Sequence, residues 1–293
     1  MKIGFIGLGN VGGKLAGSLI RNGWDVTVRD LEPVLVGEFV ARGATAGDSP
    51  AQMMRACDAV ITCLPRPDIS AAVVEGPEGL LGAKVIASGG RAVDCPVSGG
   101  CHRADTGNIS IFAGCDRATF EMILPVLTTL GRRVLHTGEI GSASILKVIT
   151  NYLATANLIT CAEALTVAKG AGMDLGTAYE AIRISSGTSF VHETESQVIL
   201  NGSRDISFTM DLVAKDIGLF QEVADRAGIP LEMNPLMRKI FADGIARYGA
   251  RELSPNIIRR LEDATGLSIL AEGFPAEMVD DEPEEPGHEV RRA

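Results

Sequence analysis

The stretch GFIGLGNVGGKLAGSL, residues 4–19, decides how the first part of this chain folds. A short apolar segment just before the first turn is typical of a strand buried on both faces of a sheet. It runs into the spacing G-x-G-x-x-G at Gly7, Gly9 and Gly12. The first glycine permits a tight turn, the second lets a pyrophosphate approach the backbone, and the third lets a helix pack closely on the strand.

The turn predicts a helix over residues 10–21 whose N-terminus faces a ligand. Its first residues, Asn10 and Val11, present free backbone N–H groups and the positive end of the helix dipole to phosphates. Three glycines at this spacing also occur by chance, and a tight turn alone would explain them. A second strand at residues 24–30 completes the order strand, turn, helix and strand, and this order favours a dinucleotide-binding unit.

The second strand ends in Asp30, eighteen residues after Gly12. A carboxylate at this place accepts hydrogen bonds from the adenosine ribose 2′-hydroxyl and repels a 2′-phosphate. We therefore expect NAD as the cofactor and NADP less so, with the neighbouring Arg29 as the feature that favours NADP.

The alternation of helix and strand continues to about residue 138 and predicts a Rossmann-type, doubly wound α/β sheet. Ligands of open α/β sheets bind at the carboxyl ends of the strands, so we expect Leu64 and Pro65 to lie at the cofactor site. The expected strands are 58–65, 91–97, 108–114 and 132–138, and the expected helices are 33–43, 116–129 and a short one with Ser49 as N-cap and Pro50 at its first position.

Residues 79–97 do not fit this scheme. If KVIA were a strand, only SGG would separate it from the next strand, whereas a parallel crossover needs about a dozen residues or more. A helix tail closed by Gly89 fits better, but the strand that should precede that helix is then absent. A complete unit needs about 20 further residues between Gly79 and Gly82, and whether they are deleted or omitted stays open.

Composition excludes several classes of function. The chain has 293 residues and a formal charge of −10, half of which comes from the seven acids and two arginines in the last nineteen residues. A mildly acidic body offers no basic surface to nucleic acid. Six scattered cysteines and solitary histidines predict neither disulfides nor a metal site, and no uninterrupted apolar run reaches membrane-spanning length. We expect a cytoplasmic protein.

The longest helical pattern, residues 141–172, carries a second candidate group. It is apolar almost all round, which fits a helix shared between the first domain and an all-helical second one. Lys147 and Asn151 stand four apart on one face of it. A lone lysine there commonly reaches water while its stem packs. In the other interpretation the ammonium is desolvated, its pKa falls, and the lysine acts as an acid/base. Burial of the Asn151 amide is costly unless the amide has a function, so Asn151 favours the acid/base interpretation.

A loop after strand 91–97, PVSGG, adds a hydroxyl and exposed N–H groups at the carboxyl edge of the sheet. Ser98, Gly99 and Gly100 would hold a substrate carboxylate there, although an ordinary glycine turn explains the spacing equally well.

These motifs together resemble the β-hydroxyacid dehydrogenases, which include 3-hydroxyisobutyrate dehydrogenase. The resemblance covers about residues 1–250 and rests on several segments in order. They are GFIGLGNVG at the start, CPVSGG at 95–100, GEIGSASILKVITN at 138–151, EAL at 163–165, SSGTS at 185–189 and AKDIGL at 214–219.

The resemblance implies roles for the residues found above. Lys147 is the catalytic acid/base, Asn151 assists it, and Ser98, Gly99 and Gly100 bind the acid group of the substrate. Lys215 is implied to come from the helical domain and close over the nicotinamide. Family members are dimers or tetramers. The family also has a Ser-Thr-x-x-Pro loop in the segment that is absent near residue 80, which affects the substrate pocket.

We therefore predict an NAD-dependent dehydrogenase of small 3-hydroxy acids, or a reductase of their semialdehydes, acting as a homodimer or homotetramer without nucleic acid or membrane partners. The alternatives are an imine reductase, which would be expected to lack Lys147, and a catalytically impaired NAD-binding sensor. The expected parts are a Rossmann-type domain (1–141), an interdomain helix (142–171), an all-α domain (172–272) and an acidic tail (273–293) that is disordered or lies on a neighbouring subunit.

Overall fold

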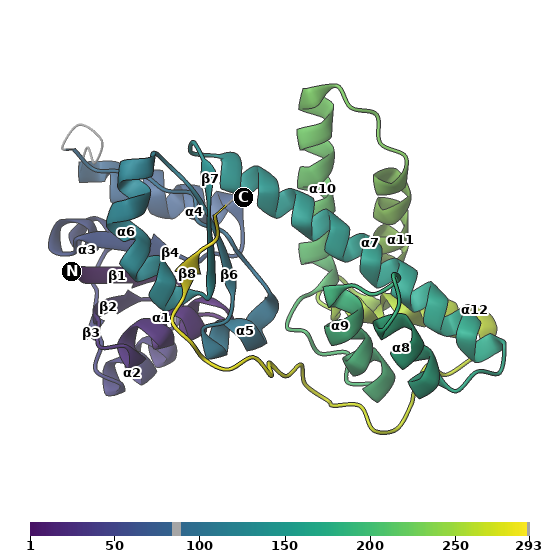
Figure 1. The fold of residues 1–293 in the computed structure, drawn as a ribbon. Coiled ribbons are helices and arrows are strands. Elements are labelled where there is room, and N and C mark those ends of the chain that lie inside the picture. The colour runs from purple at the N-terminus through teal and green to yellow at the C-terminus, as the bar shows by residue number, and fades with distance from the viewer. Residues whose placement is uncertain (84–88, 292–293) are drawn as a thin grey trace. The chain divides into compact units, whose positions relative to one another are not determined.

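The computed structural model describes residues 1–83 and 89–291 and divides the chain into two compact units. The first unit comprises Met1–Ser144 together with the chain from Asp280 onward, and the second comprises Ile145–Val279. The first is a mixed α/β unit and the second is helical, so the predicted fold class is confirmed (Figure 1).

The first unit begins with a four-stranded parallel sheet in the order β3-β2-β1-β4. The apolar segment after Met1 forms its central strand, in which Ile3 and Phe5 are fully buried. The strands are β1 (Lys2–Ile6), β2 (Asp25–Arg29), β3 (Thr45–Ala46) and β4 (Ala59–Thr62), and the helices between and after them are α1 (Gly12–Arg21), α2 (Pro33–Ala41), α3 (Pro50–Ala56), α4 (Pro67–Glu75) and the 3₁₀ helix η1 (Leu80–Ala83).

The start of α3 follows the sequence closely. Ser49 has extended backbone and its side chain accepts a hydrogen bond from the backbone N–H of Gln52, while Pro50 occupies the first helical position. A cap oxygen satisfies one of the free donors of the first turn, and proline has no N–H to lose there. The predicted N-cap is therefore confirmed.

A second four-stranded sheet has the order β5-β6-β7-β8. β5 pairs antiparallel with β6, whereas β6, β7 and β8 are parallel. Its elements are β5 (Val97–Ser98), α5 (Gly100–Thr106), β6 (Ser110–Gly114), α6 (Arg117–Leu130), β7 (Arg133–Gly138) and β8 (His288–Glu289).

Two expectations about this sheet were wrong. The strand predicted at 91–97 is reduced to β5 and an isolated bridge between Asp94 and Gly114. The single doubly wound sheet is two sheets, which end on β4 and β5. β4 and β5 lie on either side of residues 79–91, where the sequence does not fit the predicted scheme. The helix tail expected up to Gly89 falls largely on residues 84–88, which lie outside the described residues.

The acidic tail also differs from expectation. Instead of being disordered, residues 280–291 belong to the first unit, where β8 lies beside β7 (Figure 1). The backbone N–H of His288 donates to the carbonyl of Arg132 at 2.9 Å, and that of Val290 donates to the carbonyl of Val134 at 2.8 Å. Residues 280–291 are called the C-terminal arm below.

The second unit is helical, and its core contains Leu165, Ile199, Met210 and Phe241, each fully buried. The last helix, α12, ends at Thr265, and Gly266 follows it in the left-handed conformation. The helices are α7 (Ser142–Gly170), α8 (Leu175–Arg183), α9 (Phe190–Asn201), α10 (Met210–Ala227), α11 (Met233–Tyr248), the 3₁₀ helix η2 (Ser254–Ile258) and α12 (Arg259–Thr265).

α7 is the one helix among the described residues that is long and apolar enough, by length and composition, to cross a membrane. The sequence alone had suggested that no run qualifies, because charges such as Lys147 and Glu163 interrupt it. Apolar side chains on α7 are also more exposed than expected: Leu153 is 53% and Val167 is 70% exposed.

Asp94 fixes the start of α7. Its two carboxylate oxygens accept hydrogen bonds from the backbone N–H groups of Gly141 at 2.9 Å and Ser144 at 2.8 Å. These donors have no partner within the helix, so a carboxylate beside them satisfies them and complements the helix dipole.

We predict that Asp94→Ala lowers the free energy of unfolding of the first unit by about 1–2 kcal/mol, because it removes the cap of α7. The measurement is urea unfolding followed by the fluorescence of Trp24, the single tryptophan, which lies in the first unit. Asp105→Ala is the control, because the Asp105 carboxylate is 60% exposed and pairs with Lys14 only at 3.6 Å. Equal unfolding curves for the two variants would contradict the cap.

Candidate functional site

The turn between β1 and α1 is built by two close backbone contacts. Gly7 has φ +97°, and a Cβ atom at this position would lie 2.3 Å from the carbonyl oxygen of Cys63. A Cβ on Gly12 would lie 2.0 Å from the carbonyl oxygen of Gly7. Both glycines are therefore required by the fold itself. Gly9 differs, because nothing lies within 4 Å of the place where its Cβ would be.

The open space at Gly9 adjoins a helix N-terminus that no side chain caps. Val11 occupies the N-cap position of α1 without a side-chain hydrogen bond, and the first turn carries no acidic residue. Gly9 and Asn10 are both exposed. Free N–H groups, the positive end of the dipole and room for close approach suit a pyrophosphate, so the residues present fit the phosphates of a dinucleotide.

Asp30 lies at the same turn. One of its carboxylate oxygens accepts the backbone N–H of Leu8 at 2.6 Å and the other accepts that of Glu32 at 3.0 Å. The carboxylate is thus fixed beside the glycine turn and keeps lone pairs for a ribose hydroxyl. The Arg29 side chain donates to the backbone carbonyl of Asp48 at 2.5 Å, so part of this guanidinium is engaged by protein.

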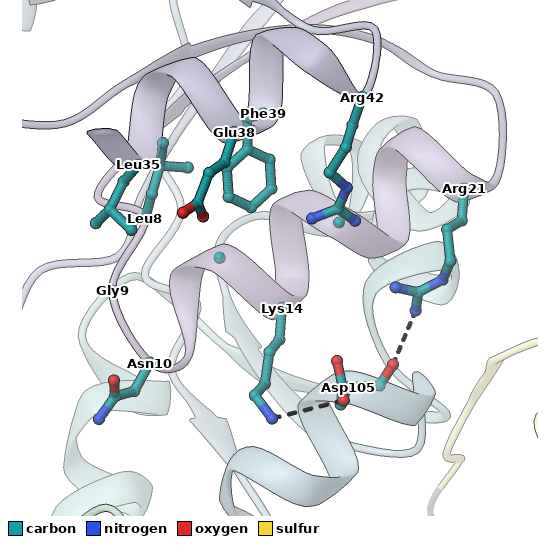
Figure 2. Close-up of a pocket in the computed structure, with 12 residues that line it drawn as sticks. Leu8, Gly9, Asn10, Lys14, Arg21, Leu35, Glu38, Phe39, Arg42 and Asp105 are labelled. Carbon is teal, nitrogen blue, oxygen red and sulfur yellow. Dashed lines mark hydrogen bonds and ion pairs between the residues drawn. The ribbon is translucent and has the colours of Figure 1, made fainter. Parts of the chain in front are cut away.

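A groove of about 360 Å³ runs along α1 and α2 and includes part of the glycine turn (Figure 2). Figure 2 shows Lys14 and Arg21 of α1 directed toward Asp105, with Glu38 and Phe39 of α2 and its C-cap residue Arg42 on the other side. Leu8, Gly9 and Asn10 line this groove, whereas Asp30, Leu64 and Pro65 do not.

Leu64 and Pro65 follow β4, and the structure separates their roles. Leu64 packs on a small core cluster with Ile6, Met53 and Leu80. Its Cδ2 lies 3.2 Å from the point where a Cβ of Gly7 would be, so Leu64 does reach the glycine turn. Pro65 is exposed.

The loop with the three predicted substrate ligands connects β5 to α5. Ser98 pairs with Ser110 in the sheet and is half-buried. Gly99 has φ +132°, which only glycine adopts without strain, and Gly100 is exposed. Among these three residues only Gly100 is exposed, and their role as substrate ligands stays a prediction.

A second polar group lies between α7 and α10 in the second unit. The side-chain amide of Asn151 donates to one oxygen of Asp216 at 2.6 Å, and the Lys215 ammonium lies 2.9 Å from the other oxygen. Asp216 is only 6% exposed. The rings of Tyr152 and Phe220 stack at 4.0 Å next to this group and fix the two helices against each other.

Lys147 belongs to the same group. Burial lowers the pKa of its ammonium to about 8, against an upward effect from the Asp216 carboxylate and a further downward effect from Lys215. The first cause is the largest because removing an ammonium from water disfavours its charged form. An amine with this pKa exchanges protons readily near neutral pH.

Asp216 is a residue that the sequence reasoning missed. It stands directly after Lys215 in the segment AKD, and a charged pair on a helix is normally a solvated face. The one hint in the sequence was the Asn151 amide, which needs a buried hydrogen-bond acceptor and had no partner assigned to it. The carboxylate joins Asn151 and Lys215 and acts on the charge of Lys147.

The predicted residues thus form two groups in different units. The first unit holds the glycine turn, Asp30 and the Ser98–Gly100 loop, and the second holds Lys147, Asn151 and Lys215. The catalytic, substrate-binding and cofactor-binding roles of these residues stay predictions.

Two family models match the chain. The model for the NAD binding domain of 6-phosphogluconate dehydrogenase matches in two stretches, residues 2–84 and 81–138. The model described as NAD-binding of NADP-dependent 3-hydroxyisobutyrate dehydrogenase matches residues 141–261. The first match is broken at the place where the sheet is broken.

Similar proteins cover nearly the whole chain. The 2-(hydroxymethyl)glutarate dehydrogenase of Eubacterium barkeri is 34% identical over 293 residues, which cover 92% of this chain and 97% of the relative. The mitochondrial 3-hydroxyisobutyrate dehydrogenase of Rattus norvegicus is 29% identical over 269 residues, with coverages of 82% and 80%. The solved structure of 3-hydroxyisobutyrate dehydrogenase from Salmonella typhimurium superposes with a TM-score of 0.77 at 25% identity, covering 89% of this chain and 99% of that one.

We predict that Gly9→Ala weakens NAD binding roughly tenfold or more, because a methyl group fills the space at the turn and displaces phosphates from the N–H groups. Its thermal midpoint should stay close to that of the wild type, since no protein atom lies within 4 Å. Calorimetric titration with NAD measures the first quantity.

The matched variant Gly12→Ala should behave in the opposite way. Its Cβ would meet the backbone at 2.0 Å, so the expected effect is a loss of stability of about 3 kcal/mol. A Gly9→Ala protein that unfolds as easily as Gly12→Ala would show that Gly9 serves the fold and not the ligand.

Proposed function

Because the chain belongs to the β-hydroxyacid dehydrogenase family, we propose that it is an NAD-dependent dehydrogenase of small 3-hydroxy acids, or in the reverse direction a reductase of the corresponding semialdehydes. The family membership makes it an oxidoreductase with NAD-binding domains. The proposal adds the class of substrate and the residue that moves the proton.

The observation that carries the proposal is the Lys147 amine, whose pKa burial lowers to about 8, next to the hydrogen-bonded pair of Asn151 and Asp216. A structural lysine keeps its ammonium in water, whereas this lysine is held where its neutral form is accessible. Relatives named for the oxidation of hydroxyacids support the same class of substrate.

Lys147 holds and moves the proton in the proposed reaction. When bound, NAD supplies the hydride acceptor. In the direction of oxidation the neutral Lys147 amine takes the hydroxyl proton as the substrate carbon loses a hydride, so a carbonyl forms and the amine becomes an ammonium. That ammonium then releases its proton to solvent. In the direction of reduction the ammonium donates the proton to the carbonyl oxygen.

Asn151 and Asp216 are proposed to orient the polar groups and to set the pKa of Lys147 for this proton transfer. Asp216 accepts from Asn151, so the amide has one fixed orientation and keeps its oxygen and second N–H for other partners. The negative charge of Asp216 also keeps the pKa of Lys147 from falling further. Lys215, held at the other oxygen of Asp216, is proposed to face the cofactor.

The first unit is proposed to bind the cofactor and the substrate's acid group. Gly7, Gly9, Asn10, Val11 and Gly12 bind the phosphates. Asp30, Leu64 and Pro65 are proposed to bind the adenosine part of the cofactor. Asp30 favours NAD over NADP because its carboxylate repels a 2′-phosphate, and the donor of Arg29 is already directed to Asp48. The backbone of Ser98, Gly99 and Gly100 binds the substrate carboxylate.

A catalytically impaired NAD-binding sensor is the second candidate, and the broken sheet favours it. The segment that is too short for a complete unit lies between β4 and β5, where the carboxyl ends of strands would line a site. Such a sensor would bind NAD without oxidising any 3-hydroxy acid. An imine reductase is disfavoured by Lys147, which that class is expected to lack.

We also propose a homo-oligomer in the cytoplasm. The exposed side chains of Leu153 and Val167 lie on one face of α7, and a second copy would remove this apolar surface from water. All six cysteines are free, as expected in a reducing compartment.

The experiment that tests the function is Lys147→Ala, which should lower kcat about 10²–10⁴-fold while NAD affinity stays unchanged. Activity is followed by NADH absorbance on a panel of 3-hydroxy acids and semialdehydes. Lys169→Ala, on the last turn of the same helix, is the control and should retain full activity. Full turnover by Lys147→Ala would remove its assigned role, and NAD binding by a wild type inactive on every substrate would favour the sensor.

The charge of Asp216 predicts a pH effect. Oxidation needs the neutral amine, so kcat/KM should rise as pH passes the Lys147 pKa of about 8. Asp216 raises this pKa, so Asp216→Asn should lower it and move the rise in kcat/KM to lower pH. Asp225→Asn, which removes a carboxylate charge from an exposed part of α10, should leave the pH profile in place. A shift to higher pH in Asp216→Asn would contradict the assignment.

A further inference from the structure

We propose that the C-terminal arm is a strap, an acidic strand that ties the end of the second unit to the sheet edge of the first and thereby joins the two units at a second point of the chain. The chain passes from the first unit to the second after Ser144, and it returns after Val279. Only the return passage depends on non-covalent docking, so it is the one that can open.

Backbone pairing gives the strap its register. β8 runs parallel to β7, and the N–H groups of Gly287, His288 and Val290 donate to carbonyl oxygens of the first unit at 3.1, 2.9 and 2.8 Å. Without the arm, β7 would be an edge strand of its sheet with unpaired backbone groups, which are a template for pairing with an extended chain. The arm supplies that chain.

A glycine makes the close approach possible. A Cβ on Gly287 would lie 2.1 Å from the carbonyl oxygen of Gly131 and 2.5 Å from that of Thr128. Any other residue at this position would push the arm away from α6 and β7. The arm therefore fits this sheet edge by shape as well as by charge.

Charge complementarity fixes the first half of the arm. The carboxylate of Glu282 lies 2.9 Å from the guanidinium of Arg103 and 3.0 Å from that of Arg133. The Asp280 side chain is only 2% exposed and accepts hydrogen bonds from Thr106 and Asn108, the latter at 2.7 Å. A carboxylate this deeply buried and bonded is an anchor, whereas exposed pairs contribute little.

The connection to the second unit is short. The amide of Asn201 donates to the carbonyl of Phe274 at 2.8 Å, and the hydroxyl of Ser203 donates to the carbonyl of Ala276 at 2.5 Å. The chain is thus held by the second unit up to Ala276 and by the first unit from Asp280. Four residues reach at most about 14 Å, so in the docked state these two anchors cannot move farther apart than that.

The strap has a consequence for turnover that rests on the proposed function, because the proposed cofactor residues and Lys147 lie in different units. A docked arm limits how far the two units separate, and a released arm leaves them joined through α7 alone. Since the contacts are largely ionic, salt should loosen the strap.

The test is hydrogen exchange on the full-length protein at the backbone amides of His288 and Val290. Glu282→Gln removes the pairs with Arg103 and Arg133 and should speed exchange roughly fivefold, as should added salt. Glu284→Gln is the matched control, because the Glu284 side chain is exposed and no ion pair of it is found in the described residues. It should exchange like the wild type.

A second variant is needed because Glu282→Gln alone could change the exchange rate too little to measure. Gly287→Val should bring these amides to the exchange rate of an unstructured chain, because its side chain clashes with Gly131 and Thr128. The strap is overturned if wild-type amides already exchange at that rate, or if both glutamate variants behave alike. It is also overturned if protection increases with protein concentration, which would show docking on a second copy. These readouts do not require activity, so failure of the strap and failure of the proposed function are distinguishable.

Discussion

The contact between the backbones of Gly7 and Gly12 is the constraint on which the first unit depends. A Cβ on Gly12 would meet the carbonyl oxygen of Gly7 at 2.0 Å, so α1 can pack on the end of β1 only because that side chain is absent, and a Cβ on Gly7 would meet the carbonyl oxygen of Cys63 after β4 at 2.3 Å. That packing directs the N-terminus of α1 to the end of the sheet and leaves the space at Gly9 empty. A ligand site thus arises from a packing requirement, because the same turn that closes the fold exposes its N–H groups.

In the second unit the polar group around Lys147 depends on one buried carboxylate, that of Asp216. Asp216 has little contact with water, and its two oxygens are taken by Asn151 and Lys215. For Lys147, burial outweighs the attraction of this carboxylate, and the pKa of the ammonium falls to about 8. With a full ion pair the lysine would remain charged, and without the carboxylate it would be neutral over a wider range. The combination gives an amine with a pKa of about 8, within reach of neutral pH.

Two features of the first unit concern sheet edges. The described strands of the first unit form two sheets that end on β4 and β5, and β8 pairs with β7 at the edge of the second sheet. An unpaired edge exposes backbone groups that must find partners. The arm pairs with the backbone of one such edge strand, β7. Its Gly287 fits against the end of α6, and its Glu282 pairs with the arginines of α5 and β7.

The sequence by itself determined the local structure and the family. Glycine spacing, apolar segments and the Ser49–Pro50 start of α3 are local signals, so β1, α1, β2, α3 and the segments of the family could be found from residues alone, whereas β3 and α4 were missed. That the segment after residue 79 is too short for a complete unit was also visible, because a crossover has a minimum length.

Only the tertiary structure decided which distant groups meet. Asp216 lies 65 residues from Asn151, and the arm lies about 150 residues from Arg132 and Arg133, so no spacing rule connects them. The same acids that predict disorder in an isolated tail form a strand when arginines and an unpaired strand edge are present. A residue's neighbours along the chain set its local conformation, whereas the energy of a charge depends on the burial and partners that the fold supplies.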